Sequence, residues 1–403
     1  MTSIDKNCFA ALEFTLAWSS DQARHRERFL ARKVNIWRDV FPPGMENVLM
    51  GLNIGDERSI SYEPGEAVPA FNKQKVLTLN RKTFKPPRQG PTVSGPRFGR
   101  FYPQGFLSDL VGIYPQNINP FRVIDVNRET FDADLNHPLA NYPFCVQVYV
   151  HNVAIKDGDV GGRCSVWMEE LADNGPGMQA RWQNQPTDFA LQEPLSREDE
   201  QGDLAFYARP RMVGHVDAQA SEHLQAEYSR FLQPGMQVLD LMSSLYSHLP
   251  EDMDLEVTGL GMNQEEMQIN PALHHHVIQD INTDPELPFS DASFDLVVCS
   301  LSIEYVIRPH VFAAQMRRVL RPGGRVILSF SNRWFPPKVT RLWTALHEFE
   351  RMGLVVEFLR RDQGYTNLET TTVRNWWRPV DDKYYGQLWA SDPVYVVTGT
   401  LKG

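Results

Sequence analysis

The chain has 403 residues, of which 42% are hydrophobic, 22% charged and 11% aromatic. This composition excludes a wholly disordered chain, and the length suits two or three domains. With 40 Lys and Arg against 50 Asp and Glu, the net charge is −10, which argues against a protein that binds nucleic acid by neutralising phosphates.

The sequence contains no segment that predicts a signal peptide or a membrane span, and no cysteine pattern that predicts a disulfide or a zinc site. No uncharged apolar run is long enough to predict a membrane-spanning helix or a membrane partner. The stretch from Met1 to Trp18 is interrupted by Glu13 and does not resemble a signal peptide. The four cysteines lie far apart without a CxxC pair, which predicts neither disulfides nor a zinc site: Cys8, Cys145, Cys164 and Cys299. We therefore expect a cytoplasmic location.

Residues 1–155 are predicted to be mostly β. Phe144–Val150 alternates in polarity like a strand, and the proline-rich stretch 85–97 is typical of a loop. Residues 22–33 are charged and contain alanine, so we expect a short helix there. The polar, turn-rich residues 156–202 predict a linker, with Trp167, Trp182 and Phe189 packed onto a domain.

Residues 203–403 have a different period. Four short apolar runs predict buried strands: 237–242, 255–260, 294–301 and 325–330. Residues 311–320 place their apolar side chains on one helical face, and Arg321-Pro322-Gly323-Gly324 ends that helix. Strands that alternate with helices predict an α/β, doubly wound parallel sheet. Ligands bind at the carboxyl ends of such strands, so the segments that follow them should line one crevice.

Three motifs in this half carry a family resemblance. They are Leu287–Ser300 (LPFSDASFDLVVCS), Val319–Ile327 (VLRPGGRVI) and Val238–Leu241 (VLDL). With their spacing, they resemble the class I S-adenosylmethionine-dependent methyltransferases, in particular the type 11 group. The resemblance covers residues 203–403 and implies a Rossmann-like fold, S-adenosylmethionine as cofactor and methyl transfer to an acceptor.

The resemblance also implies roles for single residues. Asp280 would accept the adenine amino group with Ile281 against the ring, and Ser300 and Leu301 would border the sulfonium. Asp240 would order the first loop. Further cofactor contacts would come from Met242, Ser243, Ser244, Met262 and Asn263. Tyr207 and Arg211, in a lid segment before the first strand, are candidates for the cofactor carboxylate or for substrate.

Two departures from the family pattern stand out. The first loop, Met242-Ser243-Ser244, has no glycine, although the family's loop is glycine-rich so that backbone can approach the cofactor. Gly261 occupies the position where the family has an acidic residue for the ribose hydroxyls. Asn263 is a candidate substitute, and the two serines can donate to a carboxylate. Either the cofactor binds through a variant loop, or the fold has lost it.

The acceptor site is expected after the last parallel strand. Asn332, Arg333 and Trp334, together with Tyr305, are the candidates for substrate binding. Glu304 and His248, with Tyr207, are weak candidates for catalysis, and a structural role is the alternative for each. His274, His275 and His276 are adjacent on a predicted strand, so they cannot all face one ion, and we expect no metal site.

The N-terminal half resembles the FKBP-type prolyl isomerases of the SlyD branch. The segments that carry the resemblance are 11–16, 40–56, 99–106 and 131–140. It implies an FKBP-like antiparallel sheet over residues 1–155, with an inserted flap at about 72–126. Phe14, Phe41 and Phe144 would line its apolar pocket. The family's Phe-Asp pair and the tyrosine of its Ala-Tyr-Gly turn are absent, which leaves isomerase activity open.

These observations predict a fusion of an FKBP-like module, a packed linker and a methyltransferase domain over residues 203–403. The leading function is methylation of an unidentified acceptor, a small molecule such as a thiol or a protein, with the first module binding or gating. The alternative is a peptide-binding or chaperone protein whose methyltransferase-like domain is a non-catalytic scaffold. A peptide or client of the first module is an expected partner.

Overall fold

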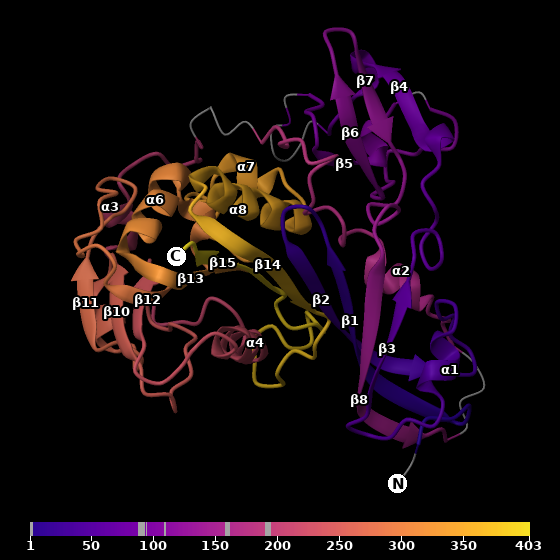
Figure 1. Ribbon diagram of the computed structural model, residues 1–403, viewed down its shortest axis with the longest axis horizontal. Coiled ribbons are helices and arrows are strands. Elements are labelled where there is room, and N and C mark those ends of the chain that lie inside the picture. The colour runs from indigo at the N-terminus through magenta and orange to yellow at the C-terminus, as the bar shows by residue number, and fades with distance from the viewer. Residues whose placement is uncertain (1–2, 88–92, 94, 109, 158–161, 190–194) are drawn as a thin grey trace. The chain divides into compact units, whose positions relative to one another are not determined.

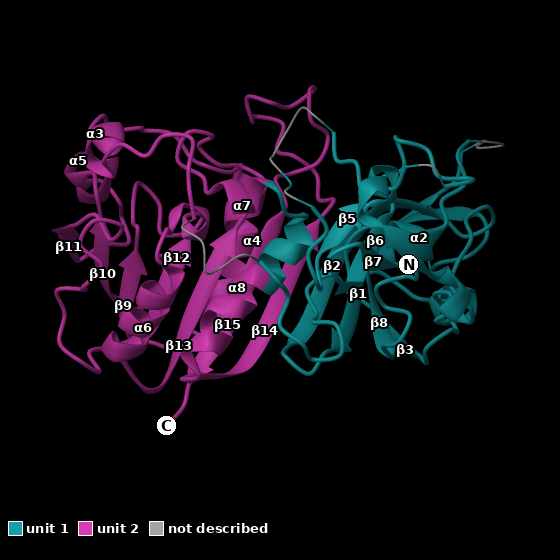
Figure 2. Ribbon diagram, turned by 90° about the horizontal axis from the view of Figure 1, so that it is seen from above, with its two compact units in different colours: residues 1–190, 345–353 teal, residues 191–344, 354–403 magenta. Residues whose placement is uncertain are grey.

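The computed structural model describes residues 3–87, 93, 95–108, 110–157, 162–189 and 195–403. The chain divides into two compact units: unit 1 comprises residues 1–190 and 345–353, and unit 2 comprises residues 191–344 and 354–403 (Figure 2). The predicted linker, 156–202, spans this division, and its residues 158–161 and 190–194 lie outside the described part. Among the described residues, no helix has the length and apolarity to span a membrane.

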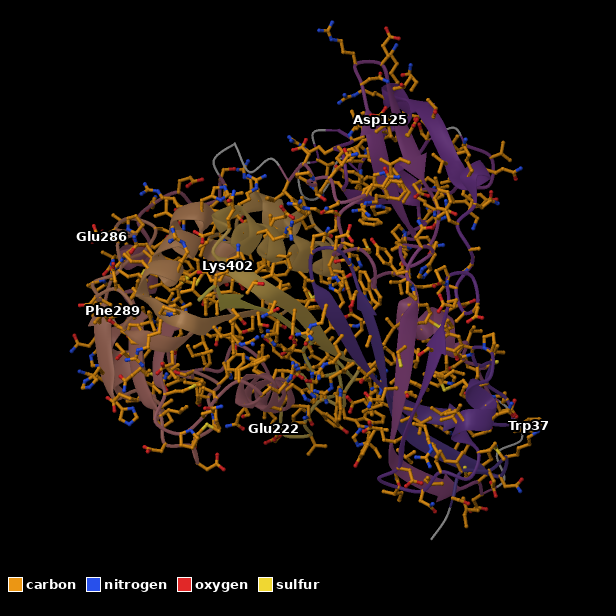
Figure 3. The ribbon with its side chains drawn as sticks, viewed as in Figure 1. Trp37, Asp125, Glu222, Glu286, Phe289 and Lys402 are labelled. Carbon is orange, nitrogen blue, oxygen red and sulfur yellow. The ribbon has the colours of Figure 1, made fainter. Side chains whose placement is uncertain are left out.

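Unit 1 contains an antiparallel sheet in the order β2-β1-β8-β3 (Figure 1). Its elements are β1 (Cys8–Ser19), β2 (Arg24–Asn35), α1 (Met45–Leu49), β3 (Glu57–Tyr62) and β8 (Phe144–Ile155). The predicted strand at Phe144–Val150 is thus present and longer. Trp37, in the turn after β2, is exposed (Figure 3).

A second antiparallel sheet, in the order β4-β7-β6-β5, forms between β3 and β8. Its elements are η1 (Lys73–Lys75), β4 (Val76–Asn80), η2 (Arg81–Thr83), β5 (Phe101–Pro103), η3 (Gln104–Phe106), β6 (Pro120–Val126) and β7 (Thr130–Asp134). It has its own apolar cluster, which includes Phe84, Phe121 and Phe131. The sheet extends eight residues beyond the insert predicted at 72–126, because β7 completes it.

The helix predicted at residues 22–33 is wrong, because residues 24–33 belong to β2. Their burial alternates, with His25, Glu27 and Phe29 buried and Arg24 exposed, which is the period of a strand. β2 pairs with β1 along its length, and His25 stacks on Trp18 at 4.0 Å between ring centroids. This charged segment is a strand because it pairs with β1. The composition of the segment alone does not reveal that pairing.

Unit 2 contains most of the remaining elements. These are α3 (Asp203–Tyr207), α4 (Ala218–Ser229), β9 (Gln237–Leu241), β10 (Glu256–Gly261), α5 (Gln264–Gln268), β11 (His275–Ile278), β12 (Phe294–Ser300), η4 (Ile303–Tyr305), α6 (Pro309–Val319), β13 (Leu320–Phe330), α7 (Arg341–Thr344), β14 (Tyr365–Arg374) and β15 (Val394–Leu401). Helix α8 (Glu348–Asp362) begins in unit 1 and continues into unit 2. The four predicted strands correspond to β9, β10, β12 and β13, and the predicted helix to α6.

The strands of unit 2 follow the order β11-β10-β9-β12-β13-β15-β14. The first five are parallel, whereas β15 runs antiparallel to β13 and to β14. The chain starts at β9 in the middle and moves outward first to one side and then, from β12, to the other. The strand order therefore reverses between β9 and β12, which is the point where doubly wound sheets bind ligands.

Helices cover both faces of the parallel strands (Figure 1). Leu296 and Val298 of β12 share an apolar cluster with Leu224 and Tyr228 of α4. The alternating residues Val297 and Cys299 are equally buried and point to the opposite face, where Figure 1 shows α6. Burial on both faces explains why β12 is almost continuously apolar, whereas the edge strand β11 is largely exposed.

One crossover departs from the strand–helix pattern. Residues 242–255, between β9 and β10, contain turns and coil but no helix. The segment therefore leaves β9 as an irregular loop, and its residues reach the edge of the sheet without helical hydrogen bonds to position them. Side-chain hydrogen bonds and close packing hold it instead.

Candidate functional site

A pocket opens at the carboxyl ends of the parallel strands of unit 2. The empty space there is about 550 Å³, a figure that includes the open solvent at its mouth. It is lined by Tyr207, Arg211, His215, Met242, Ser243, Ser244, Met262, Asn263, Glu266, Leu301, Ser302, Tyr305 and Phe335.

Nine of the predicted site residues lie in this lining. They are Tyr207, Arg211, Met242, Ser243, Ser244, Met262, Asn263, Leu301 and Tyr305. Other predicted residues do not line it: Asp240, Asp280, Ile281, Ser300, Glu304, His248, Asn332, Arg333 and Trp334. The lining also includes four residues that the sequence did not single out for binding: His215, Glu266, Ser302 and Phe335.

The carboxylate of Asp240 anchors the first loop through hydrogen bonds. One of its carboxylate oxygens, Oδ2, accepts hydrogen bonds from the hydroxyls of Ser243 and Ser247, both at 2.6 Å. Burial raises the pKa of Asp240 to about 6, although the two serine hydrogen bonds oppose this shift. Side-chain hydrogen bonds to a buried carboxylate thus order a loop that no helix continues.

The structure gives a physical reason why glycine stands at the end of β10. A Cβ atom added to Gly261 would lie 2.2 Å from the carbonyl oxygen of Ser243. The amide of Ser243 also donates to Leu260 at 2.9 Å, so the first loop rests directly on this strand. Met242 meanwhile adopts a left-handed conformation with φ of 58°. The close approach that the family makes with loop glycines is made here at Gly261, and an acidic side chain at that position is sterically excluded.

Glu266 supplies a carboxylate near the position that Gly261 leaves empty. Asn263 caps α5 by accepting from the amide of Glu266 at 3.1 Å, so Glu266 stands in the first turn of that helix. Its carboxylate accepts from the backbone amide of Arg211 at 2.6 Å and from the hydroxyl of Ser244. The signal in the sequence was the Asn-x-x-Glu spacing of a helix start.

Asn263 is engaged in holding backbone. Its Nδ2 donates to the carbonyl oxygens of Tyr207 at 3.0 Å and Ala208 at 3.3 Å. Since its Oδ1 caps α5, both ends of the amide are used. Asn263 and Glu266 therefore fasten the segment 207–211 over the pocket, and Glu266 is the better candidate for the missing acid.

The opposite end of the pocket is aromatic. Tyr305 and Phe335 stack at 6.1 Å between centroids, and Tyr207 meets Phe335 edge to face, also at 6.1 Å. The hydroxyl of Tyr305 accepts from the amide of Phe335 at 2.8 Å, which fixes the two rings together. Burial raises the pKa of Tyr305 well above its usual value and lowers that of His215, so at neutral pH both are uncharged.

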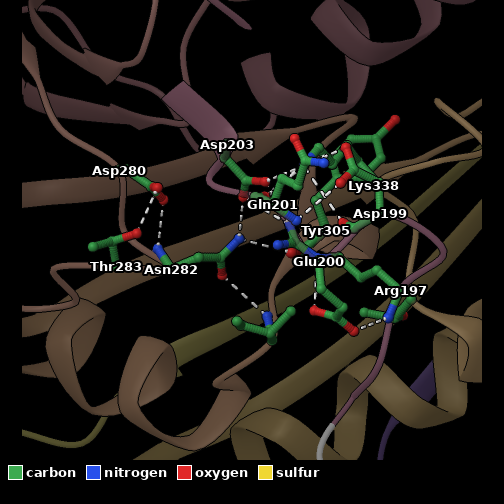
Figure 4. A network of polar contacts seen from close by, with 12 residues as sticks. Arg197, Asp199, Glu200, Gln201, Asp203, Asp280, Asn282, Thr283, Tyr305 and Lys338 are labelled. Carbon is green, nitrogen blue, oxygen red and sulfur yellow. Dashed lines mark hydrogen bonds and ion pairs between the residues drawn. The ribbon is translucent and has the colours of Figure 1, made fainter. Parts of the chain in front are cut away.

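Asp280 lies in a tight turn after β11 (Figure 4). Its carboxylate accepts from the amide of Asn282 at 2.9 Å and the hydroxyl of Thr283 at 2.8 Å. The residue is buried, as is Ile281, so Asp280 is not a surface turn aspartate. A carboxylate offers about four lone-pair positions, so these two bonds leave room for a further donor.

A buried charge network joins this turn to the start of α3 (Figure 4). Asp203 accepts from both Arg197 Nη1, at 2.7 and 2.8 Å, and Asn282 Nδ2, at 3.0 Å. Lys338, which is fully buried, lies 3.1 Å from Asp203 and 2.9 Å from Asp199. Burial raises the pKa of Asp203, but the hydrogen bonds from Arg197, Asn282 and Lys338 lower it below its usual value.

Asn282 is the centre of this network. Its amide also donates to the carbonyl of Tyr305 at 3.0 Å and accepts from the amide of Ile307 at 3.1 Å. The network therefore connects the Asp280 turn with two pocket walls, through Tyr305 and through the helix that carries Tyr207. The sequence did not indicate it, because its members are spread over 140 residues.

At the end of β12, the side chains of Ser300 and Leu301 have different surroundings. The Ser300 hydroxyl pairs with the Tyr228 hydroxyl at 2.8 Å, beneath α4 and away from the pocket. Leu301 lines the pocket with φ of 52°, which is an unusual conformation for a bulky side chain. Strain of this kind concentrates at binding sites.

The weak catalytic candidates Glu304 and His248 lie elsewhere. Glu304 is buried, and its carbonyl oxygen accepts from the amide of Thr340. His248 borders a second hollow of about 1100 Å³, with Ser221 and the exposed Glu222 of α4 (Figure 3). Its Nδ1 is 2.7 Å from the Ser221 hydroxyl, and burial lowers its pKa to about 4. Neither residue lines the pocket at the strand ends.

The predicted substrate residues after β13 face different partners. Arg333 contacts Asp392 at 3.3 Å and lies over Tyr384, and Asn332 Nδ2 is 3.5 Å from the Tyr395 hydroxyl. Phe335, one residue past Trp334, is the one that borders the pocket. The predicted residues Asn332, Arg333 and Trp334 precede Phe335, and a backbone bond from the amide of Lys338 to the carbonyl of Phe335 forms the turn that follows.

In unit 1, the residues predicted to line an FKBP-like pocket belong to the core. Phe14 and Phe144 are buried there, and Phe41 packs against the same cluster. Helix α2 (Trp167–Ala172), from the predicted linker, places Trp167 at 5.9 Å from Phe14. Backbone bonds between Val40 and both Ser165 and Trp167, and one from Trp167 Nε1 to Asp39 at 3.0 Å, fix the tryptophan in place.

Comparison with known proteins agrees with the geometry of unit 2. Residues 243–328 match a family described as methyltransferase domain. Over 102 residues the chain is 30% identical to a malonyl-[acyl-carrier protein] O-methyltransferase of a Marinomonas species, which covers 25% of this chain and 36% of that protein. Over 111 residues it is 32% identical to the ubiquinone/menaquinone biosynthesis C-methyltransferase UbiE of Rubrivivax gelatinosus, with 26% and 44% covered.

The chain thus spans less than half the length of these curated relatives. Among solved structures, a complex of the Haloferax volcanii Trm112 methyltransferase activator with a putative methyltransferase matches with a TM-score of 0.35. The identity is 18%, over 45% of this chain and 91% of that one. The family match and the sheet order agree with the predicted methyltransferase domain: residues 243–328 lie in a class I methyltransferase domain within unit 2.

Proposed function

We propose that unit 2 binds S-adenosylmethionine in the pocket at the ends of β9, β10 and β12 and transfers its methyl group to an acceptor. The observation that carries the proposal is the gathering of Ser244, Glu266 and Asp240 around a first loop that packs on Gly261. This arrangement supplies the hydrogen-bonding groups that the missing glycines and acid would otherwise have provided.

The residues fit the parts of this cofactor. Glu266 would accept the ribose hydroxyls. Asp280 and Ile281 lie outside the pocket lining, after the edge strand β11, so the adenine would have to extend beyond that lining for Asp280 to accept its amino group and Ile281 to lie against the ring. Met242 and Leu301 would flank the sulfonium. The hydroxyls of Ser243 and Ser244 donate to Asp240 and Glu266, so they would have to turn away from these carboxylates to bind that of the cofactor. When bound, the cofactor supplies an activated methyl group. The chain's own contribution is to position the acceptor in line with it and to exclude water.

We further propose that unit 1 is FKBP-like and serves as a binding module without isomerase turnover. Two features support this: the antiparallel order β2-β1-β8-β3, and a separate sheet inserted between β3 and β8. The burial of Phe14 against Trp167, and of Phe144 in the same core, argues against an open catalytic cup. The competing function, a peptide-binding protein with a non-catalytic scaffold, has no comparable support in unit 2, where the pocket keeps its polar lining.

The test is a calorimetric titration with S-adenosylmethionine and S-adenosylhomocysteine. Wild type should bind both with micromolar affinity, and Asp280→Ala should bind at least ten-fold more weakly (about 1.4 kcal/mol). Asp284→Ala, which removes an exposed carboxylate from the same turn, is the matched control and should bind like wild type. Absence of binding by wild type at millimolar ligand would contradict the proposal.

A further inference from the structure

The strand order assigns the two ends of the pocket to different parts of the reaction. Asp280 follows β11, Glu266 follows β10, Met242 follows β9 and Phe335 follows β13. Because neighbouring parallel strands end along one edge in the order β11-β10-β9-β12-β13, these residues lie along the edge in the same sequence. If the adenosine part occupies the β11–β10 end, as the proposed function requires, the acceptor must approach from the end near Phe335.

The acceptor end presents flat apolar surfaces. Tyr305 and Phe335 are nearly parallel, with 27° between their planes, and Tyr207 stands at 74° to Phe335. His215, which is uncharged at neutral pH, adds an edge-on contact to Phe335 at 5.5 Å. Walls of this kind accommodate a planar ring by stacking and edge contacts more readily than a flexible alkyl chain.

One fixed positive charge lies on these walls. The Arg211 guanidinium carbon is 4.6 Å from the ring centroid of Phe206, 4.9 Å from that of Phe335 and 5.4 Å from that of Tyr207. Its Nη2 donates to the Phe206 carbonyl at 3.1 Å, so the group is held in place. The pocket's carboxylate, Glu266, bonds the Arg211 backbone amide and the Ser244 hydroxyl, which leaves the remaining guanidinium donors for a ligand.

We propose that the acceptor is an aromatic oxyanion, a phenolate or an aromatic carboxylate, whose ring lies against Phe335 and Tyr305 and whose charge pairs with Arg211. This inference rests on the proposed function. A guanidinium binds a carboxylate or phenolate oxygen strongly and repels an ammonium group. The proposal replaces the small thiol and the protein as acceptors.

An acceptor that is already ionised also removes the need for a base. The oxygen forms a bond to the methyl carbon, the carbon–sulfur bond breaks, and its electron pair stays on sulfur. The negative charge of the oxygen and the positive charge of the sulfonium cancel, and no proton moves. An apolar, water-poor pocket favours a step that destroys charge. This agrees with the positions of Glu304 and His248 outside the pocket lining.

The experiment follows the absorbance of 4-nitrophenol added to protein saturated with S-adenosylhomocysteine. Pairing with a guanidinium stabilises the phenolate, so wild type should bind the probe and lower its apparent pKa. Arg211→Gln should bind it at least ten-fold more weakly, and Phe335→Leu several-fold more weakly. Arg209→Gln, an exposed arginine two residues away, is the matched control and should bind the probe like wild type. Benzylamine, a ring with the opposite charge, should not compete.

The outcomes separate this inference from the function on which it rests. If wild type binds S-adenosylhomocysteine but does not bind 4-nitrophenolate, or if benzylamine binds more tightly, the inference is overturned and the proposed function stands. If Arg211→Gln loses affinity for S-adenosylhomocysteine and not for the probe, Arg211 serves the cofactor carboxylate, and the inference is wrong. If wild type does not bind S-adenosylhomocysteine at all, the proposed function fails and the inference falls with it.

Discussion

Aromatic side chains have different surroundings in the two units. In unit 2, Tyr207, Tyr305 and Phe335 border a hollow, together with a guanidinium, hydroxyls and a carboxylate. In unit 1, Phe14 lies in the middle of β1 and Phe144 is the first residue of β8, and both are buried in an apolar core that includes Trp167. The rings of unit 2 that border polar loop groups stay available to a ligand. The rings of unit 1 are covered by the elements that pack on the sheet.

The comparison depends on the walls of the unit 2 pocket being held open by buried polar groups. Unit 1 also buries a charge pair, Arg100 with Glu350 at 3.0 Å, but its core around Phe14 is apolar. Unit 2 combines Lys338, Asp203 and Asn282 behind its aromatic wall. The following predictions test that difference, beginning with the largest expected effect.

Lys338→Met should destabilise the protein by about 3–5 kcal/mol, because it leaves the buried Asp203 with one cation fewer. Urea unfolding measures the free energy. Arg163→Met, which breaks an exposed ion pair with Glu170, should change it by less than about 1 kcal/mol. Equal losses in the two variants would show that the network is not what holds unit 2.

Gly261→Ala should cost about 3 kcal/mol and abolish binding of S-adenosylhomocysteine, because the added Cβ overlaps the Ser243 carbonyl and displaces the first loop. Gly202→Ala places the same methyl group where nothing lies within 4 Å and serves as the control. Gly261→Asp, which restores the acid that the family carries there, should bind no better than Gly261→Ala. Cofactor affinity gained by Gly261→Asp would refute the steric account.

Asp240→Asn should change the pH dependence of stability. The folded-state pKa of Asp240, about 6, lies above its unfolded value, so the native state holds the proton more tightly and wild type loses stability as pH rises through 6. Relative to wild type, the variant should gain on the order of 2 kcal/mol between pH 4 and pH 7. Denaturant curves at both pH values measure this, and a constant difference between the proteins would contradict the raised pKa.

How much of this the sequence could predict differs between the elements. The strands β9, β10, β12 and β13 were predictable because each contains a short run of apolar side chains that the fold buries. β2 was not, because its pairing with β1 decides its structure. In the pocket, Met242, Ser243 and Leu301 followed from their places after strands, whereas Glu266 depends on the packing of the loop against Gly261. Nothing local marks Arg197, Asp203, Asn282 and Lys338 as one network.

Unit 1 should show no prolyl isomerase activity. Two of the rings that would form the catalytic cup, Phe14 and Phe144, are buried in the core, and Phe14 lies 5.9 Å from Trp167, so a prolyl peptide has no access to them. In a peptide assay, the full chain should leave the time of uncatalysed isomerisation unchanged at tens to hundreds of seconds. A many-fold acceleration would remove the contrast between the units.

The most direct test of the central claim, that unit 2 binds the cofactor through a carboxylate displaced from the usual strand end to Glu266, is a double-mutant cycle with the ligand. The affinities of wild type and Glu266→Gln are measured for S-adenosylhomocysteine and for its 2′,3′-dideoxy analogue, with Glu265→Gln as the exposed control. We predict that Glu266→Gln weakens S-adenosylhomocysteine about ten-fold and leaves the dideoxy analogue unchanged. Equal losses for both ligands, or no loss for either, would contradict the account.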